Sequence, residues 1–369
     1  EDSYMKNVNY ADPYLMTNGT DWQREIFQTA FMHNHQVGVT GGSKNYNYAL
    51  SGGYLDQEGI QIGSSFERAS FRANLETDVY SWLKIGMNGY YAKTEQEVKL
   101  EDGTVINTVL DMYPDVPARN PDGSFGYVPK NDFATYYTNP VMEASLRQNT
   151  RKNSQLDYNI YANITPIKGL VARLEYGGSR GWGDTYFFSP AYTLGTDPVR
   201  SEGSRGSLRN KYNSFKQYAT YDIDPLKGHH LQVMAGHESQ WGSWSQLSAG
   251  RKDYISNIMP SLNFGDVNTA TNSENGGKWA IESYYGRLNY NLLDRYLLTL
   301  TLRADGSSKL GPNNRWGWFP SVAAAWRISQ EKFMKDIKWL NNMKLRLGWG
   351  LVGNQNAGDY AYGVSMKTT

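Results

Sequence analysis

One short stretch of the sequence decides the class of fold, and it reads Arg68-Ala69-Ser70-Phe71-Arg72-Ala73-Asn74-Leu75-Glu76. Small or apolar side chains occupy every second position, and polar or charged side chains occupy the positions between them. Successive side chains of an extended strand point to opposite faces, so this stretch has one apolar face and one polar face. The pattern is typical of a β-strand that separates an apolar environment from water.

The same period of two recurs along the chain in segments of about ten residues, the length of a tilted strand that crosses a bilayer. We expect about twelve strands, at residues 35–40, 46–54, 68–76, 83–94, 155–164, 170–176, 211–223, 231–240, 283–291, 295–305, 319–329 and 343–351. Short turns alternate with long loops, which we predict at residues 56–65, 97–150, 181–210, 242–277 and 306–318. Outer-membrane β-barrels have short periplasmic turns and long extracellular loops. The sequence therefore predicts an all-β fold, an antiparallel section of a transmembrane β-barrel.

Composition and charge exclude several other classes of protein. The chain of 369 residues contains 28 Tyr, 11 Trp and 37 Gly but no Cys, a usage that favours strands and turns over helices and leaves no disulfide or thiol chemistry. The formal net charge is +1 with no basic run, which argues against a nucleic-acid partner. No run of about 20 apolar residues predicts a membrane-spanning helix. We find no arrangement of side chains typical of an enzyme and predict no catalytic, cofactor or metal residues.

The order of turns and loops also predicts how the chain is organised. If the short turns are periplasmic, the strand at 35–40 runs downward and needs a partner before it, and the strand at 343–351 runs upward with no partner after it. An open sheet edge is not stable in lipid. We therefore expect a middle section of a larger barrel, with residues 1–34 as an extracellular loop region and residues 35–369 as barrel strands joined by long extracellular loops.

Several motifs resemble those of a known family. The first part of the chain contains Thr20-Asp21-Trp22-Gln23 and Gly53-Tyr54-Leu55-Asp56-Gln57-Glu58-Gly59. The later part contains Tyr285-Gly286-Arg287-Leu288-Asn289-Tyr290, Arg303-Ala304-Asp305-Gly306-Ser307-Ser308 and Gly353-Asn354-Gln355. No single motif is specific, but the ordered set, from about residue 20 to 355, resembles the SusC-like branch of the TonB-dependent outer-membrane transporters.

The resemblance implies a barrel of 22 strands in the bacterial outer membrane, of which this chain supplies about 12, with a plug domain in the lumen that is absent from this chain. It implies TonB as the energy-coupling partner, through an N-terminal part that is also absent, and a SusD-like surface lipoprotein as a lid. The implied activity is import of a bulky nutrient rather than catalysis. An oligosaccharide is the favoured substrate class and an oligopeptide is the alternative.

Charged side chains on the polar faces of the predicted strands are candidates for the lumen. The functional interpretation is a charged lining that guides the solute, and the interpretation we favour is a set of cross-strand ion pairs and contacts to the plug. The candidates are Arg68, Arg72, Glu76, Arg173, Glu175, Arg287 and Arg303, with Lys344 and Arg346 on the last strand.

Four aromatic residues near the predicted loops are candidates for substrate contact, namely Trp182, Tyr186, Trp241 and Trp244. Sugars stack their apolar faces on such rings. Aromatic girdles at the membrane interface place Trp and Tyr at the same height, and we favour that explanation for Trp241 and Trp244.

A soluble or surface-attached all-β protein that binds or cleaves glycans is the alternative from another class. It would account for the aromatic residues and the glycines. A propeller of this kind needs a repeat of about 40 to 50 residues, and the sequence contains none that we can find.

Overall fold

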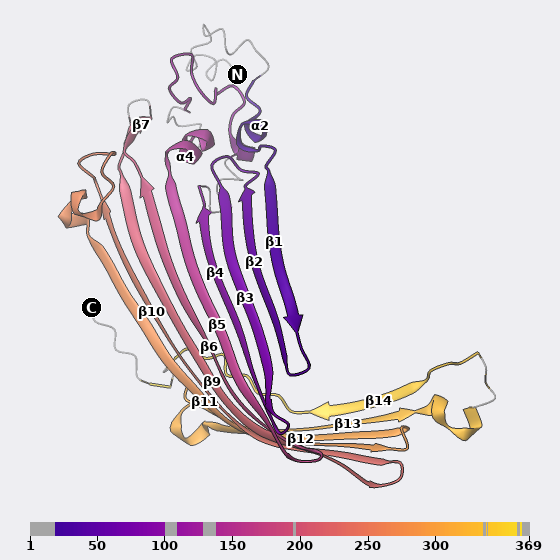
Figure 1. Ribbon diagram of the computed structural model, residues 1–369. Helices are drawn as coiled ribbons and strands as arrows, with labels where there is room; N and C mark the ends of the chain where they lie inside the picture. Colours follow the sequence, from indigo (N-terminus) through magenta and orange to yellow (C-terminus); the bar gives the residue numbers. More distant parts are fainter. Residues whose placement is uncertain are drawn as a thin grey trace.

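The computed structural model describes residues 19–99, 109–127, 138–194, 197–334, 337, 339–359 and 362–363. Most of these residues form one antiparallel sheet, in which each strand pairs with its neighbour along the chain (Figure 1). Its strands are β1 (Met32–Gly42), β2 (Tyr46–Glu58), β3 (Ser65–Tyr80), β4 (Leu83–Glu97), β5 (Gln148–Ile167), β6 (Leu170–Ser189), β9 (Glu202–Leu226), β10 (His229–Lys252), β11 (Thr271–Leu292), β12 (Tyr296–Ser307), β13 (Trp316–Arg327) and β14 (Lys344–Gly350). A short hairpin, β7 (Tyr192–Leu194) and β8 (Asp197–Val199), lies between β6 and β9.

The twelve predicted strands are all present and in the predicted order, but the central ones are much longer than predicted. β5 and β6 have 20 residues each, β9 has 25 and β10 has 24. They extend into the segments 181–210 and 242–277, which were predicted as loops. The prediction was too short there because the apolar alternation stops where both faces of a strand meet water, although the backbone ladder continues.

The connections alternate as predicted, with one exception. Tight turns join β5 to β6 and β9 to β10, and each contains a glycine with positive φ, Gly169 at 86° and Gly228 at 82°. At the opposite end of the sheet lie the longer connections, including the segments 98–147 and 253–270. The exception is the connection between β13 and β14, which contains the 3-10 turns η5 (Ile328–Gln330) and η6 (Lys332–Met334) at the end of the short turns. We call the two ends of the sheet the turn end and the loop end.

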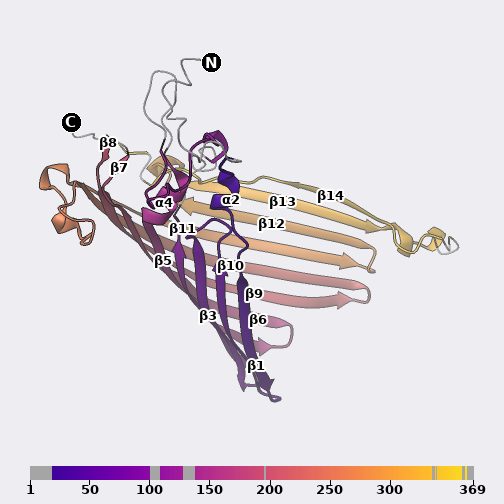
Figure 2. The same ribbon diagram turned by 90° about the horizontal axis from the view of Figure 1, so that it is seen from above.

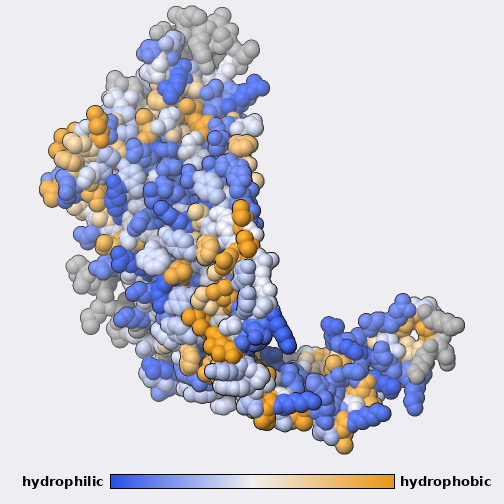
Figure 3. All heavy atoms as spheres, viewed as in Figure 1, coloured by the Kyte–Doolittle hydropathy of each residue, from blue (hydrophilic) through white to orange (hydrophobic). Residues whose placement is uncertain are grey.

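The two faces of the sheet differ in chemistry. We call the face that carries Phe71 the outer face and the face that carries Arg72 the inner face. Large apolar side chains on the outer face are exposed, among them Val39 at 56%, Phe71 at 51% and Leu75 at 41%. Figure 3 shows such residues gathered over the lower part of the strands near β1 to β4, toward the turn end, whereas the surface above them is mostly hydrophilic. The outer face therefore has an apolar band that ends well below the loop end.

A small cap lies above the loop ends of the first strands (Figure 1), and Figure 2 shows it from above. It contains α2 (Trp22–Ile26) and α4 (Pro140–Leu146), and Asp21 caps α2 by accepting a hydrogen bond from the N–H of Arg24. Trp22 and Ile26 pack against a buried cluster that includes Val109, Met112 and Val141. Apolar burial of this kind stabilises the cap, and Ile62 of the connection between β2 and β3 packs against the same cluster. Two residues of the predicted loop region 1–34 therefore pack against described residues of the connection between β4 and β5.

Among the described residues, no helix is both long enough and apolar enough to cross a membrane.

Glu331 links β12 and β13 by hydrogen bonds at the turn end, and its contribution to the stability of the fold is expected to depend on pH. Its carboxylate accepts hydrogen bonds from the Tyr296 hydroxyl at 2.6 Å and the Trp326 indole at 3.0 Å, and these hydrogen bonds lower the pKa of Glu331. A lowered folded-state pKa stabilises the fold above the unfolded pKa, near 4.5, and this stabilisation is lost as pH falls through the folded value. We expect Glu331→Gln to lower the urea midpoint of the full-length protein at pH 7 and to have much less effect at acid pH. An equal loss at both pH values would contradict this account.

Candidate functional site on the inner face

A row of polar side chains crosses the inner face from β3 to β12, with Gly86 as its member on β4. Directly paired residues on successive strands form this row, beginning with Glu76 and Gly86 and ending with Ser283 and Asp305. Because paired residues point to the same face, the row is set by the register alone. The register puts these polar residues in the row: Glu76, Tyr161, Glu175, Lys216, Glu238, Ser283 and Asp305. We call these residues, together with Lys84, Arg173 and Arg303 of the adjacent row, the polar belt.

The first half of the polar belt is held by one carboxylate and one stacked cation. Glu76 accepts hydrogen bonds from the ammonium of Lys84 at 2.8 Å and from the hydroxyl of Tyr161 at 2.7 Å. The guanidinium carbon of Arg173 lies 3.8 Å from the centroid of the Tyr161 ring, and its Nε donates to Glu175 at 2.9 Å. Charge and ring stacking thus connect β3 to β6 without a gap.

The second half is built around Glu238, whose side chain is 10% exposed. Lys216 lies 3.5 Å from Glu175 and 3.8 Å from Glu238, so it joins the two halves. Arg303 is 3.4 Å from Glu238 and donates to Asp305 at 2.7 Å and to the Ser283 hydroxyl at 2.8 Å. The belt therefore sets four cations, Lys84, Arg173, Lys216 and Arg303, against four carboxylates, Glu76, Glu175, Glu238 and Asp305, and Asp78 is a fifth carboxylate 3.7 Å from Lys84.

The belt divides the charged residues predicted from the sequence into two sets. Glu76, Arg173, Glu175 and Arg303 are members of the belt. Arg68, Arg72 and Arg287 also lie on the inner face, but among the described residues none of them has a carboxylate oxygen within 4.0 Å. Arg68 and Arg72 line a separate hollow of about 310 Å³ over β1 to β4, where Arg72 stacks on Tyr90 with its guanidinium carbon 5.2 Å from the ring centroid.

A segment after β14 folds back over the loop end of the inner face. Residues 351–359 form this segment, which we call the strap. Gln355 accepts a hydrogen bond from the Ser307 hydroxyl at 2.9 Å. Asp359 accepts one from the Trp244 indole at 2.9 Å and lies 3.2 Å from the ammonium of Lys309.

Beneath the strap lies a cavity of about 520 Å³, which opens onto the end of the polar belt. Arg303 and Asp305 contribute charge to its wall, Phe319 contributes an aromatic ring, and the strap itself contributes Asn354 and Gln355. Neutral amides beside a ring can bond hydroxyl or peptide groups and cover an apolar surface. The arrangement suits recognition of a polar solute, and it contains no nucleophile with an adjacent base.

The four aromatic candidates do not lie together. Trp182, Tyr186 and Trp241 occupy the outer face, and Trp244 occupies the inner face, because residues three apart in a strand point to opposite sides. Trp241 lies beside Tyr176, with ring centroids 6.5 Å apart, as a girdle residue would. Trp244 instead holds the strap through Asp359, so its place at the lipid interface is not supported.

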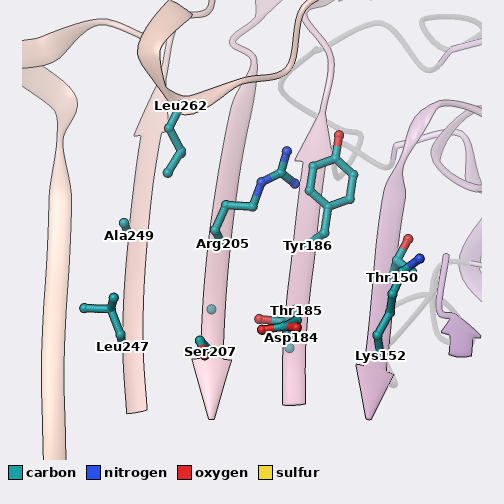
Figure 4. A pocket seen from close by; sticks show the side chains of 11 residues that line it. Thr150, Lys152, Asp184, Thr185, Tyr186, Arg205, Ser207, Leu247, Ala249 and Leu262 are labelled. Carbon is teal, nitrogen blue, oxygen red and sulfur yellow. The ribbon is translucent and has the colours of Figure 1, made fainter. Parts of the chain in front are cut away.

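Tyr186 lines a second cavity of about 520 Å³, on the outer face near the loop end. Figure 4 shows its ring beside the side chain of Arg205, whose guanidinium carbon is 3.5 Å from the ring centroid. Leu262 of the connection between β10 and β11 covers this cavity. Because it opens on the outer face, this cavity is separated by the sheet from the polar belt.

Several members of the site were not predicted as site residues from the sequence, namely Tyr161, Lys216, Glu238, Asp305, Gln355 and Asp359, although Asp305 and Gln355 belong to quoted family motifs. The alternation of faces along the predicted strands places Tyr161, Lys216, Glu238 and Asp305 on the polar face. The two strap residues follow the last strand, where no periodic signal exists.

Comparison with known proteins gives consistent results for the fold. Residues 96–366 match a family model described as TonB dependent receptor-like, beta-barrel. TonB-dependent receptor SusC of Bacteroides thetaiotaomicron is 31% identical over 383 residues, covering 94% of this chain and 36% of SusC. TonB-dependent receptor P3 of Formosa agariphila is 30% identical over 362 residues, covering 95% of this chain and 36% of that receptor. The chain spans about a third of the length of these curated relatives.

Solved structures agree with this assignment. The structure of the RagAB peptide transporter superposes with a TM-score of 0.80 at 28% sequence identity, covering 93% of this chain and 39% of that chain. The ferric citrate transporter FecA superposes with a TM-score of 0.52 at 7% identity, which is a likeness of fold alone.

Proposed function

Because this chain belongs to the TonB-dependent receptor β-barrel family, we propose that the intact protein imports a bulky polar nutrient, an oligosaccharide, across the bacterial outer membrane. In this proposal TonB supplies the energy and a SusD-like lipoprotein closes the extracellular side. The soluble glycan-binding alternative is set aside, because the family is one of outer-membrane barrels.

The observation that carries the proposal is the paired charge of the polar belt. The belt pairs its cations with its carboxylates, so this part of the wall offers a solute hydrogen bonds without a strong net field. A neutral solute rich in hydroxyl groups fits this wall better than a highly charged one. The amides of Asn354 and Gln355 and the ring of Phe319 in the strap cavity suit the same chemistry.

Two substrate classes remain to be separated by experiment. RagAB is a peptide transporter, whereas the wall chemistry of this chain favours a sugar. Arg68 and Arg72, which have no carboxylate partner among the described residues, are placed on the inner face to contact either the carboxylates of a peptide or a plug domain.

The test is uptake by cells that make the full-length protein, with fluorescent neutral oligosaccharides and fluorescent oligopeptides offered separately. We expect uptake of the oligosaccharide, its loss when the inner-membrane proton gradient is dissipated, and surface binding that survives that treatment. Energy-dependent uptake of the peptide alone would mean that the substrate is an oligopeptide and not an oligosaccharide. Uptake that persists without the gradient would contradict the coupled mechanism.

A further inference from the structure

We propose that the outer face of β6 and β9 binds a phosphate-bearing glycolipid of the outer leaflet, with its acyl chains on the apolar band and its phosphate on a basic patch. The basic patch consists of Lys93, Arg180, Arg209 and Lys211, with Trp182 among them. This surface lies on the opposite face from the proposed import path and is independent of it.

The register concentrates these cations on the outer face. Arg180 of β6 is paired directly with Lys211 of β9, and Trp182 is paired directly with Arg209. Lys93 of β4 is paired with Ser154 of β5, which in turn is paired with Trp182. Side chains of directly paired residues start only roughly 5 Å apart, so Arg180 and Lys211 repel each other unless an anion lies between them.

No carboxylate neutralises the patch in the part of the chain that the structure describes. Lys93, Arg209 and Lys211 are exposed and have no carboxylate oxygen within 4.0 Å there. Arg180 is held in place by neutral acceptors, the carbonyl of Tyr212 and the side-chain oxygen of Asn213, both at 2.7 Å. In the next row toward the loop end the cation is neutralised, because Lys152 pairs with Glu95 at 2.7 Å.

The surroundings of the patch identify the ligand as an amphiphile with a sugar headgroup. Toward the turn end on β5 and β6 lie exposed apolar side chains, including Ile160 and Leu174, which suit acyl chains, and Leu156 is paired directly with Arg180 of the patch. Toward the loop end lies the cavity of Tyr186 and Arg205, where a ring and polar groups suit a sugar (Figure 4). Apolar, cationic and sugar-compatible surfaces therefore follow one another along the strands, and a free phosphate ion would use only the middle one.

The experiment compares two triple variants of the full-length protein purified in detergent. The test variant is Lys93→Gln, Arg209→Gln and Lys211→Gln. The matched control is Lys44→Gln, Lys168→Gln and Lys227→Gln, which removes three exposed cations from the turn end. Each protein is titrated with phosphorylated lipid A and with enzymatically dephosphorylated lipid A, and bound lipid is counted by native mass spectrometry.

We expect the test variant to bind phosphorylated lipid A at least about tenfold more weakly than the parent, since it lacks three cations that attract the anionic lipid. The control and the parent should bind phosphorylated lipid A with equal affinity. Both should bind dephosphorylated lipid A about as weakly as the test variant binds that lipid. Heat-modifiable gel mobility reports folding of all three proteins. The proposal would be overturned if the test variant bound phosphorylated lipid A as tightly as the parent does. It would also be overturned if the parent bound the dephosphorylated lipid as tightly as the phosphorylated one. A defect in uptake would bear only on the import function.

Discussion

Leu75→Arg is expected to abolish assembly of the full-length protein in the outer membrane. Leu75 lies on the outer face of β3, 41% exposed, between its directly paired neighbours Tyr48 and Met87. An arginine on the lipid face of a barrel costs about 2–4 kcal/mol at the bilayer midplane. That cost is a large part of the 5–15 kcal/mol or so by which folded proteins are typically stable. Outer-membrane fractionation, with heat-modifiable gel mobility as the measure of folding, checks the result.

Asn74→Arg is the matched control for this substitution. Asn74 is the preceding residue of the same strand, and its side chain lies on the inner face beside Ala49 and Asn88. An arginine there faces the polar wall, so we expect a folded, heat-modifiable protein. If Leu75→Arg assembled as well as Asn74→Arg, the outer face would not be in contact with lipid.

The period of two was enough to predict which segments are strands, but not how far they extend. The alternation of residues 231–240 is produced by the apolar band, and it predicted only the central part of β10 (His229–Lys252). Beyond the band, water meets both faces, so hydrogen bonds to β9 and β11 continue while the sequence pattern disappears. The same effect made Trp244 resemble a residue near a loop when it lies within a strand.

The face of each charged residue was predictable, whereas its partner was not. The alternation with a period of two was enough to put Glu76 and Glu175 on the polar face. The contacts that connect them through Tyr161 and Arg173 depend on the register between four strands, which the alternation does not give. Register depends on turn geometry and packing across the sheet, which a single strand does not encode. The strap is a more extreme case, since Asp359 and Trp244 are separated by 115 residues.

Glu238→Gln is expected to lower the stability of the full-length protein by about 1–3 kcal/mol, because it removes the charge that separates Lys216 from Arg303 while keeping the shape of the side chain. Glu274→Gln is the matched control, an exposed carboxylate on β11 whose loss should change little. The temperature midpoint of the gel-mobility shift measures both. A Glu238→Gln midpoint equal to that of the control would show that the polar belt does not stabilise the wall.

Adding Arg303→Gln to Glu238→Gln distinguishes a coupled network from separate ion pairs. Each single substitution leaves a partly buried charge without one of its partners, whereas the double substitution removes a cation and a carboxylate together. We therefore expect the double variant to lose less stability than the sum of the two single variants. Additive losses would mean that Glu238 and Arg303 act independently despite their 3.4 Å separation, and the polar belt would then be a row of unconnected side chains.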